Sequence, residues 1–327
     1  MQPFSASVCK STVLFLCTLS LLGSWAVAQY DGGGTEISLR TLNSSQPHEA
    51  TAPNYVIVDL SEKKLLHFYP ELKGLQPADT QQDLPKLLER VGANVNLLLD
   101  SIPDVVCHED VVQEQLDKKG FTKGLPLFTG QYKYLVLAHS TGAGIRLNEI
   151  RIGPTGKEAD PRPAGGPLLA QGFGLLPLHF HPFHQSAAKF RYLGRQVVDN
   201  QNDYVVAFAQ QREKAQLTGI INVDGVPVQV AYQGIAWINP DNFQIVRMRT
   251  DLLQPQPDVG LQETEVRLSE VRLMTLSTPL WLPHDVVVTR STKSNKVREK
   301  HEFSSWKRSI LEFKSPPETA HPAEKQK

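Results

Sequence analysis

The sequence lacks the paired cysteines of a disulfide-stabilised domain. It contains three cysteines, and two of them, Cys9 and Cys17, lie in an apolar N-terminal stretch. If that stretch is removed as a leader, only Cys107 remains and no internal disulfide can form. The mature fold must therefore be stabilised by a hydrophobic core.

The sequence also lacks an excess of charge of either sign. It has 34 Lys+Arg against 34 Asp+Glu in 327 residues, with 40% hydrophobic residues. This composition suits one large or two modest globular domains. It does not support a nucleic-acid partner, because proteins that bind nucleic acids usually show a basic stripe.

Familiar catalytic motifs are missing as well. The sequence has no Gly-x-Ser-x-Gly or His-Glu-x-x-His pattern, and residues 153–157 lack the glycine spacing and the Ser/Thr of a phosphate loop. Glu109 and Asp110 are adjacent in an alternating stretch, so they would face opposite sides of a strand and could not form an acid/base pair. We therefore expect no catalytic residues, and an enzyme of unidentified type is the alternative.

Two histidine-containing stretches have residue types that could carry chemistry. Cys107 could be a nucleophile beside His108, but neighbours in a strand face opposite sides, so a buried structural cysteine is expected. His179 and His181 could form a metal pair, but Pro182 breaks their geometry and no carboxylate lies nearby in the sequence. We therefore predict neither a metal site nor a cofactor.

The N-terminus has the features of a secretory signal. Lys10 precedes an apolar run over 12–22, and Ala26-Val27-Ala28 has the small-x-small pattern of a cleavage site. We predict a signal peptide over residues 1–28, with an uncleaved membrane anchor as the alternative. Residues 29–80 are predicted to be poorly ordered, and the Pro- and charge-rich residues 314–327 to form a disordered tail.

The clearest predicted element is an amphipathic helix over residues 84–102. Asp83 is a suitable N-cap, Pro85 fits the first turn and Pro103 ends the pattern. The apolar stripe recurs at three- and four-residue spacing and consists of Leu84, Leu87, Leu88, Val91, Val95, Leu98, Leu99 and Ile102. Core packing is the simplest explanation of this stripe.

After Pro103 the apolar period changes to two. We predict strands over 105–116, 132–139, 143–152, 190–194, 204–209, 226–230, 235–238, 243–252, 263–276, 285–290 and 299–311. The connections are too short for the crossover helices of a parallel sheet. The expected fold class is mainly β with α (α+β), built on one strongly curved antiparallel sheet. A short, broken helix is expected over 168–189.

One predicted hairpin is apolar on both faces. If a four-residue turn over 239–242 sets the register, Ala236 and Ile245 share one face, which the predicted helix can cover. The opposite face would then carry Ile235, Trp237, Val246 and Met248. An uncovered apolar face marks a binding surface, so we predict that these four residues line a ligand cavity. The alternative is a closed barrel or sandwich with a dry core.

Aromatic and imidazole side chains near this cavity are candidates for its lid. Phe180, His181 and Phe183 lie in the expected broken helix, among alternating histidines, aromatics and prolines. We predict that this segment caps the cavity.

The same hairpin also suggests a family. Residues 234–247 resemble the W-I-D-P-x-T-x-x-I-x-R hairpin of LolA/LolB-like periplasmic lipoprotein carriers, with Asn239 in place of Asp and Asn242 in place of Thr or Ser. The resemblance covers 84–313, within an expected domain of residues 81–313. It implies an open half-barrel, lidded by helices, whose concave face holds acyl chains.

The resemblance also implies a role and a location. It suggests a non-enzymatic binding protein for a lipid or an acylated lipoprotein, in the periplasm and associated with the outer membrane. An envelope protein is a further expected partner. The alternative is a periplasmic protein-interaction or sensor module that uses the same fold without lipid cargo.

Overall fold

A computed structural model describes residues 36–39, 55–141, 144–159, 169–215, 217, 219–223, 226–254, 261–291 and 296–309. The expected signal peptide (1–28) and tail (314–327) lie outside these residues. No helix in the described part of the chain is both long enough and apolar enough to cross a bilayer.

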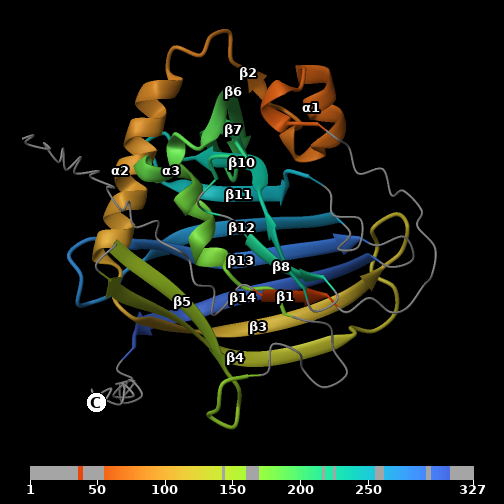
Figure 1. Cartoon of the computed structure of the whole chain (residues 1–327), viewed down its shortest axis with the longest axis vertical. Coiled ribbons are helices and arrows are strands. Elements are labelled where there is room, and N and C mark those ends of the chain that lie inside the picture. Colours follow the sequence, from red (N-terminus) through yellow and green to blue (C-terminus); the bar gives the residue numbers. More distant parts are fainter. Residues whose placement is uncertain are drawn as a thin grey trace, which may run out of the picture.

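The protein is built mainly from strands, as expected (Figure 1). The helices are η1 (Ile57–Asp59), α1 (Glu62–Phe68), η2 (Pro70–Leu72), α2 (Leu84–Ser101), η3 (Phe173–Phe180) and α3 (Pro182–Gln185), where η denotes a 3-10 helix. A small sheet contains β1 (Glu36–Leu39), β8 (Gly219–Val223) and β9 (Val226–Val230). The large sheet contains, in spatial order, β2 (Gln76–Pro77), β6 (Ala188–Val198), β7 (Gln201–Gln210), β10 (Tyr232–Ile238), β11 (Ile245–Leu252), β12 (Leu261–Val271), β13 (Leu280–Ser291), β14 (Lys296–Arg308), β3 (Val105–Leu116), β4 (Phe128–Thr141) and β5 (Gly144–Ile152).

The large sheet is an open half-barrel. All its neighbouring strands pair antiparallel, and within the described residues its edge strands β2 and β5 do not pair with each other. Its concave face surrounds one apolar core together with α2 and η3, which lie side by side with α3 in Figure 1. The predicted fold class is therefore confirmed.

Helix α2 begins at Leu84 and ends at Ser101, as its periodicity predicts. Asp83 is the N-cap residue, as expected, but it has helical backbone angles and its side chain accepts no capping hydrogen bond. Gly92 allows α2 to approach the η3–α3 segment. A Cβ at this position would lie 2.7 Å from Gln185 Nε2 and 3.2 Å from the Phe180 carbonyl oxygen.

Residues 55–77 cover the convex face where β6, β7 and β10 form it, so the expectation of a poorly ordered segment is wrong for them. Tyr69 and Leu72 are buried in one core with Ile235 and Trp237. The sequence of this segment has no periodic pattern that could predict its helices, because η1, α1 and η2 are each too short to produce one. Both faces of the hairpin are apolar because each is covered by a different part of the same chain.

The register of the hairpin also differs from the prediction. Ile238 pairs with Ile245, not Phe243, and Ala236 pairs with Met248. The loop is longer than the expected four residues. Asn239 Oδ1 accepts hydrogen bonds from the backbone N–H groups of Asp241 and Asn242, and Phe243 adopts a φ of 59°. An irregularity between Trp237 and Ile238 then shifts the pairing by one more residue.

Candidate functional site

The concave face is apolar where α2 covers it. Val91 of α2 is fully buried, and Val95 nearly so, in one core with Met248, Val266 and Val286 from the sheet. Such a layer between a helix and a sheet excludes water and has no polar groups that require specific partners. It is chemically suited to hydrocarbon.

Only a few hydrogen bonds hold α2 in place among the described residues. Asn94 Nδ2 donates to the Asn242 carbonyl at 2.7 Å, and Gln185 Nε2 donates to the Leu88 carbonyl at 3.0 Å. No strand of the half-barrel pairs with α2, because its own backbone groups are used within the helix. The helix could therefore move without breaking the sheet.

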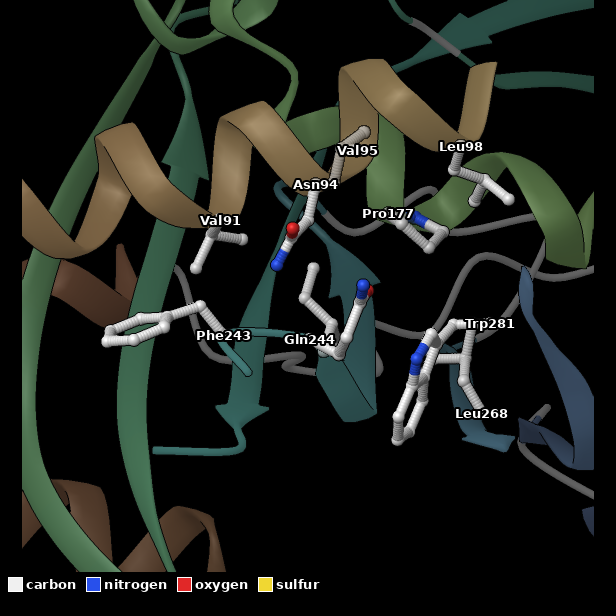
Figure 2. A pocket seen from close by; sticks show the side chains of 10 residues that line it. Val91, Asn94, Val95, Leu98, Pro177, Phe243, Gln244, Leu268 and Trp281 are labelled. Atoms are coloured by element: carbon white, nitrogen blue, oxygen red, sulfur yellow. The ribbon is translucent and has the colours of Figure 1, made fainter. Parts of the chain in front are cut away.

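A small pocket opens at the seam between α2 and the hairpin (Figure 2). Its lining is apolar except for Asn94 and Gln244, and consists of Val91, Asn94, Val95, Leu98, Pro177, Phe243, Gln244, Ile245, Leu268 and Trp281. Figure 2 shows Leu98, Pro177 and Trp281 on three separate elements around it. It has room for about one water molecule, so as it stands it is too small to hold a ligand.

The other half of the concave face carries a buried ionic network. Arg151 donates from Nε and Nη2 to both oxygens of Glu109 at 2.7 Å. His301 bridges Glu109 and Glu299 at 2.8 and 2.7 Å, and Arg290 Nη1 lies 3.2 Å from Glu299. All five side chains are at most 8% exposed.

This network anchors the chain that leads into η3. The Ala170 N–H donates to Glu299 at 2.6 Å, and the Ala170 carbonyl accepts from Arg151 at 2.7 Å. The backbone N–H groups of Gly172 and Gly174 both donate to Glu149, which also accepts from Tyr134. Residues 169–174 are therefore held to the sheet by charged side chains, whereas α2 is held mainly by apolar contacts.

The protonation states of the network follow from its geometry. Burial alone would raise the pKa of Glu109, but the Arg151 charge and the hydrogen bond from His301 outweigh it and hold this pKa below its usual range. Burial alone would lower the pKa of His301, but hydrogen bonds to Glu109 and Glu299 raise it. The network therefore keeps its carboxylates ionised and favours a protonated His301.

The four residues predicted to line one cavity do not share a face. Ile235 and Trp237 are fully buried on the convex side, beneath residues 55–77, and Val246 packs against the same core. Met248 lies on the concave side with α2. Ile235, Trp237 and Val246 therefore lie against residues 55–77 and do not line the space beneath α2. Met248 lies on the opposite face from them because the true register differs by three residues from the expected one at that point, and an odd shift exchanges the faces.

The three predicted lid residues lie at the η3–α3 junction, beside α2. Phe180 is fully buried and packs against Phe190 and Phe208 of the sheet. His181 Nε2 lies 3.0 Å from Asn96 Oδ1 of α2, whereas Phe183 is 49% exposed. The segment therefore contacts both the sheet and α2.

Of the other chemical candidates, Cys107 and His179 are buried, whereas the His108 side chain is 44% exposed. Cys107 is buried and free, as expected, and burial raises the pKa of its thiol well above the usual range. Burial lowers the pKa of His179 to about 3 and that of His184 to about 4. Within the described residues, no group of His, Cys, Asp and Glu is arranged to hold a metal ion.

Sequence reasoning missed the ionic network, although one signal for it was present. Glu109 occupies an inward position of β3, on the same face of the strand as Val105, Cys107 and Val111. A charged residue within an apolar alternation predicts a buried partner. The identity of that partner, Arg151 on β5, could not be read from local pattern.

The chain is distantly similar to several solved structures. No family model and no curated protein sequence matches the chain significantly. A solved DUF1329 family protein from Desulfovibrio piger is 9% identical, covers 69% of this chain and 93% of its own, and has a TM-score of 0.38. An outer membrane lipoprotein-sorting protein domain from Vibrio parahaemolyticus is 13% identical, covers 68% and 92%, and has a TM-score of 0.35. A LolA superfamily protein from Nitrosomonas europaea is 12% identical, covers 69% and 94%, and has a TM-score of 0.33.

Proposed function

We propose that the protein binds the acyl chain of a lipid or an acylated lipoprotein, between α2 and the concave face of the sheet, without catalysing a reaction. The observation that carries this proposal is the apolar layer beneath α2, which has a small, mostly apolar pocket at its seam. The predicted leader supports an exported, periplasmic protein associated with the outer membrane, with an envelope protein as a further partner.

Binding requires α2 to move, because the seam has room for about one water molecule. Each methylene that leaves water contributes about 0.8 kcal/mol, so a chain of about twelve carbons contributes roughly 10 kcal/mol. This gain offsets the loss of contacts between α2 and the sheet, which the chain would replace with similar apolar contacts. The anchored residues 169–174 would stay in place while α2 opens.

The lid residues support the same arrangement. Phe180 holds the η3–α3 segment to the sheet, and His181 connects it to α2. We infer that this segment forms the fixed edge against which α2 opens and closes.

The test compares two neighbouring leucines of α2. Leu98 lines the seam, whereas Leu97 is 48% exposed on the other side of the helix. Leu98→Asp should weaken uptake of a fluorescent fatty acid by delipidated protein roughly tenfold or more, because a carboxylate at the seam must be desolvated. Leu97→Asp is the control and should bind as the wild type does.

The outcome separates two functions. If the wild type takes up no fatty acid, the carrier function is wrong. The closed seam would then favour the alternative, a protein-interaction or sensor module, and a stoichiometric partner should co-purify from an envelope fraction. If both variants bind equally well, the chain does not enter at this seam.

A further inference from the structure

The loop between β3 and β4 exposes large apolar side chains. Residues 117–127 read Asp-Lys-Lys-Gly-Phe-Thr-Lys-Gly-Leu-Pro-Leu. Phe121 is 68% exposed, Leu125 is 86% exposed and Leu127 is 47% exposed. Single exposed apolar residues are common, but three of them within seven positions of one loop indicate an interaction site.

Hydrogen bonds to the loop keep these side chains in solvent. Asp117 Oδ1 accepts from the backbone N–H groups of Lys119 at 2.8 Å and Phe121 at 2.9 Å. The Lys123 N–H donates to the Gln115 carbonyl at 2.7 Å, so the loop continues the pairing of β3. The apolar side chains are therefore presented by an ordered backbone and do not fold back onto the core.

The loop is also basic. Lys118, Lys119 and Lys123 are exposed, and Lys296 of β14 lies next to Gly120. The loop's only acidic residue, Asp117, uses a carboxylate oxygen for the turn. Exposed aromatic and aliphatic side chains surrounded by lysines match the chemistry of an anionic lipid surface, where the rings enter the acyl boundary and the ammonium groups meet phosphates.

We propose that loop 117–127 docks the protein onto an anionic lipid bilayer, with Phe121 and Leu125 inserted and the three lysines against the headgroups. A protein partner fits less well, because lysine is depleted in protein interfaces and eleven residues fall short of the roughly 800 Å² that a stable interface buries per partner. A second copy would bring like charges together.

The location of the loop leaves the acyl-chain site free. Strand β3 starts next to the end of α2 and runs for 12 residues to the loop, which corresponds to roughly 40 Å at about 3.3 Å per residue. Figure 1 shows the loop at the end of the sheet remote from the lower end of α2. Docking through the loop does not depend on the proposed acyl-chain function.

The experiment measures co-sedimentation of the full mature chain with vesicles. One vesicle contains phosphatidylcholine alone, and the other contains equal parts of phosphatidylcholine and phosphatidylglycerol. The wild type should bind the second and not the first. Lys118→Gln/Lys119→Gln/Lys123→Gln should weaken binding roughly a hundredfold, at about tenfold or less per lysine. Phe121→Ser/Leu125→Ser should weaken it by at least roughly tenfold.

Matched controls lie elsewhere on the surface. Lys63→Gln/Lys64→Gln removes exposed lysines from α1, and Met274→Ser removes a fully exposed apolar side chain between β12 and β13. These variants should bind as the wild type does, and thermal melting should show that all variants fold. Phe121→Trp gives a direct readout, because its fluorescence should shift to the blue with the anionic vesicles only.

Three results would overturn the proposal. The wild type could bind neither vesicle, or it could bind with no sensitivity to the loop variants. The loop variants could instead abolish a concentration-dependent dimer in the absence of vesicles, which would assign the loop to a protein interface.

Discussion

Replacing Arg151 with methionine should destabilise the protein strongly. Arg151 makes a two-pronged ion pair with Glu109, and their side chains are 3% and 0% exposed. The substitution leaves the Glu109 carboxylate buried with His301 as its remaining cationic partner. It also removes the donor to the Ala170 carbonyl, so the anchor of residues 169–174 is weakened.

Arg151→Met should lower the free energy of unfolding by about 3 to 5 kcal/mol, the range for removing one partner of a buried ion pair. For a domain of this size, each kcal/mol lowers the melting temperature by about 2–4 °C, so Tm should fall by roughly 6–20 °C. Arg272→Met is the matched control. Its ion pair with Glu270 is exposed, with Arg272 at 79%, so its loss should cost about 1 kcal/mol or less.

Thermal and urea unfolding of the single and double variants test the reasoning. Arg151→Met/Glu109→Gln should lose less stability than Arg151→Met alone, because no uncompensated charge stays buried. The folded-state pKa of Glu109 lies below its unfolded value, so its contribution is present above about pH 4.3 and is lost as pH falls through the folded pKa. The difference in stability between the wild type and Arg151→Met should therefore become smaller as the pH is lowered.

Two results would refute this account. Arg151→Met could melt within about 2 °C of the wild type, which would mean that the ion pair contributes little. Alternatively, the double variant could be less stable than the single one, which would mean that the desolvated charge is not the source of the loss.

Four further predictions concern the pH dependence of stability, the two faces of the hairpin, the mature N-terminus and the Cys107 thiol. The folded-state pKa of His301 is raised, so its contribution to the free energy of unfolding should be complete below about pH 6.5 and be lost as pH rises through the folded pKa. His301→Gln should remove that part of the pH dependence of the melting temperature. Ile245→Glu should unfold the protein, because Ile245 is 4% exposed in the concave core. Val246→Glu lies at a half-buried position on the convex face, so this variant should fold and still take up fatty acid. Equal unfolding of both variants would contradict the assignment of these residues to opposite faces. Mature protein from the periplasmic fraction should begin near Gln29, and an intact Met1 would contradict this expectation. The Cys107 thiol should react with a thiol reagent only after unfolding, and rapid labelling of the folded protein would contradict that.

Local patterns determined the elements of this protein. The three- and four-residue spacing of leucine and valine placed α2 within one residue of its observed end, and Pro103 marked the change to strands. The alternation from Val105 to Leu116 matches β3 at both ends. These predictions hold because helix and strand periods are properties of neighbouring residues.

Only the tertiary structure decided what the two faces of the hairpin contact. Residues 55–77 show no period, yet they cover the convex face because sheet side chains bind their backbone. Gln233 Oε1 accepts from the Ile57 N–H at 2.8 Å, and Gln196 Nε2 donates to the Glu71 carbonyl at 2.7 Å. These partners are 176 and 125 residues apart in the chain, so no local pattern records them.

The same reason explains the candidate site. The loop of the hairpin depends on the positive φ of Phe243 and on hydrogen bonds to Asn239, and these set the register that separates Met248 from Trp237. The charged half of the concave face requires β3, β5 and β14 to lie together. Sequence alone could indicate an unusual inward charge at Glu109, but its partners come from strands that meet only when the half-barrel curves.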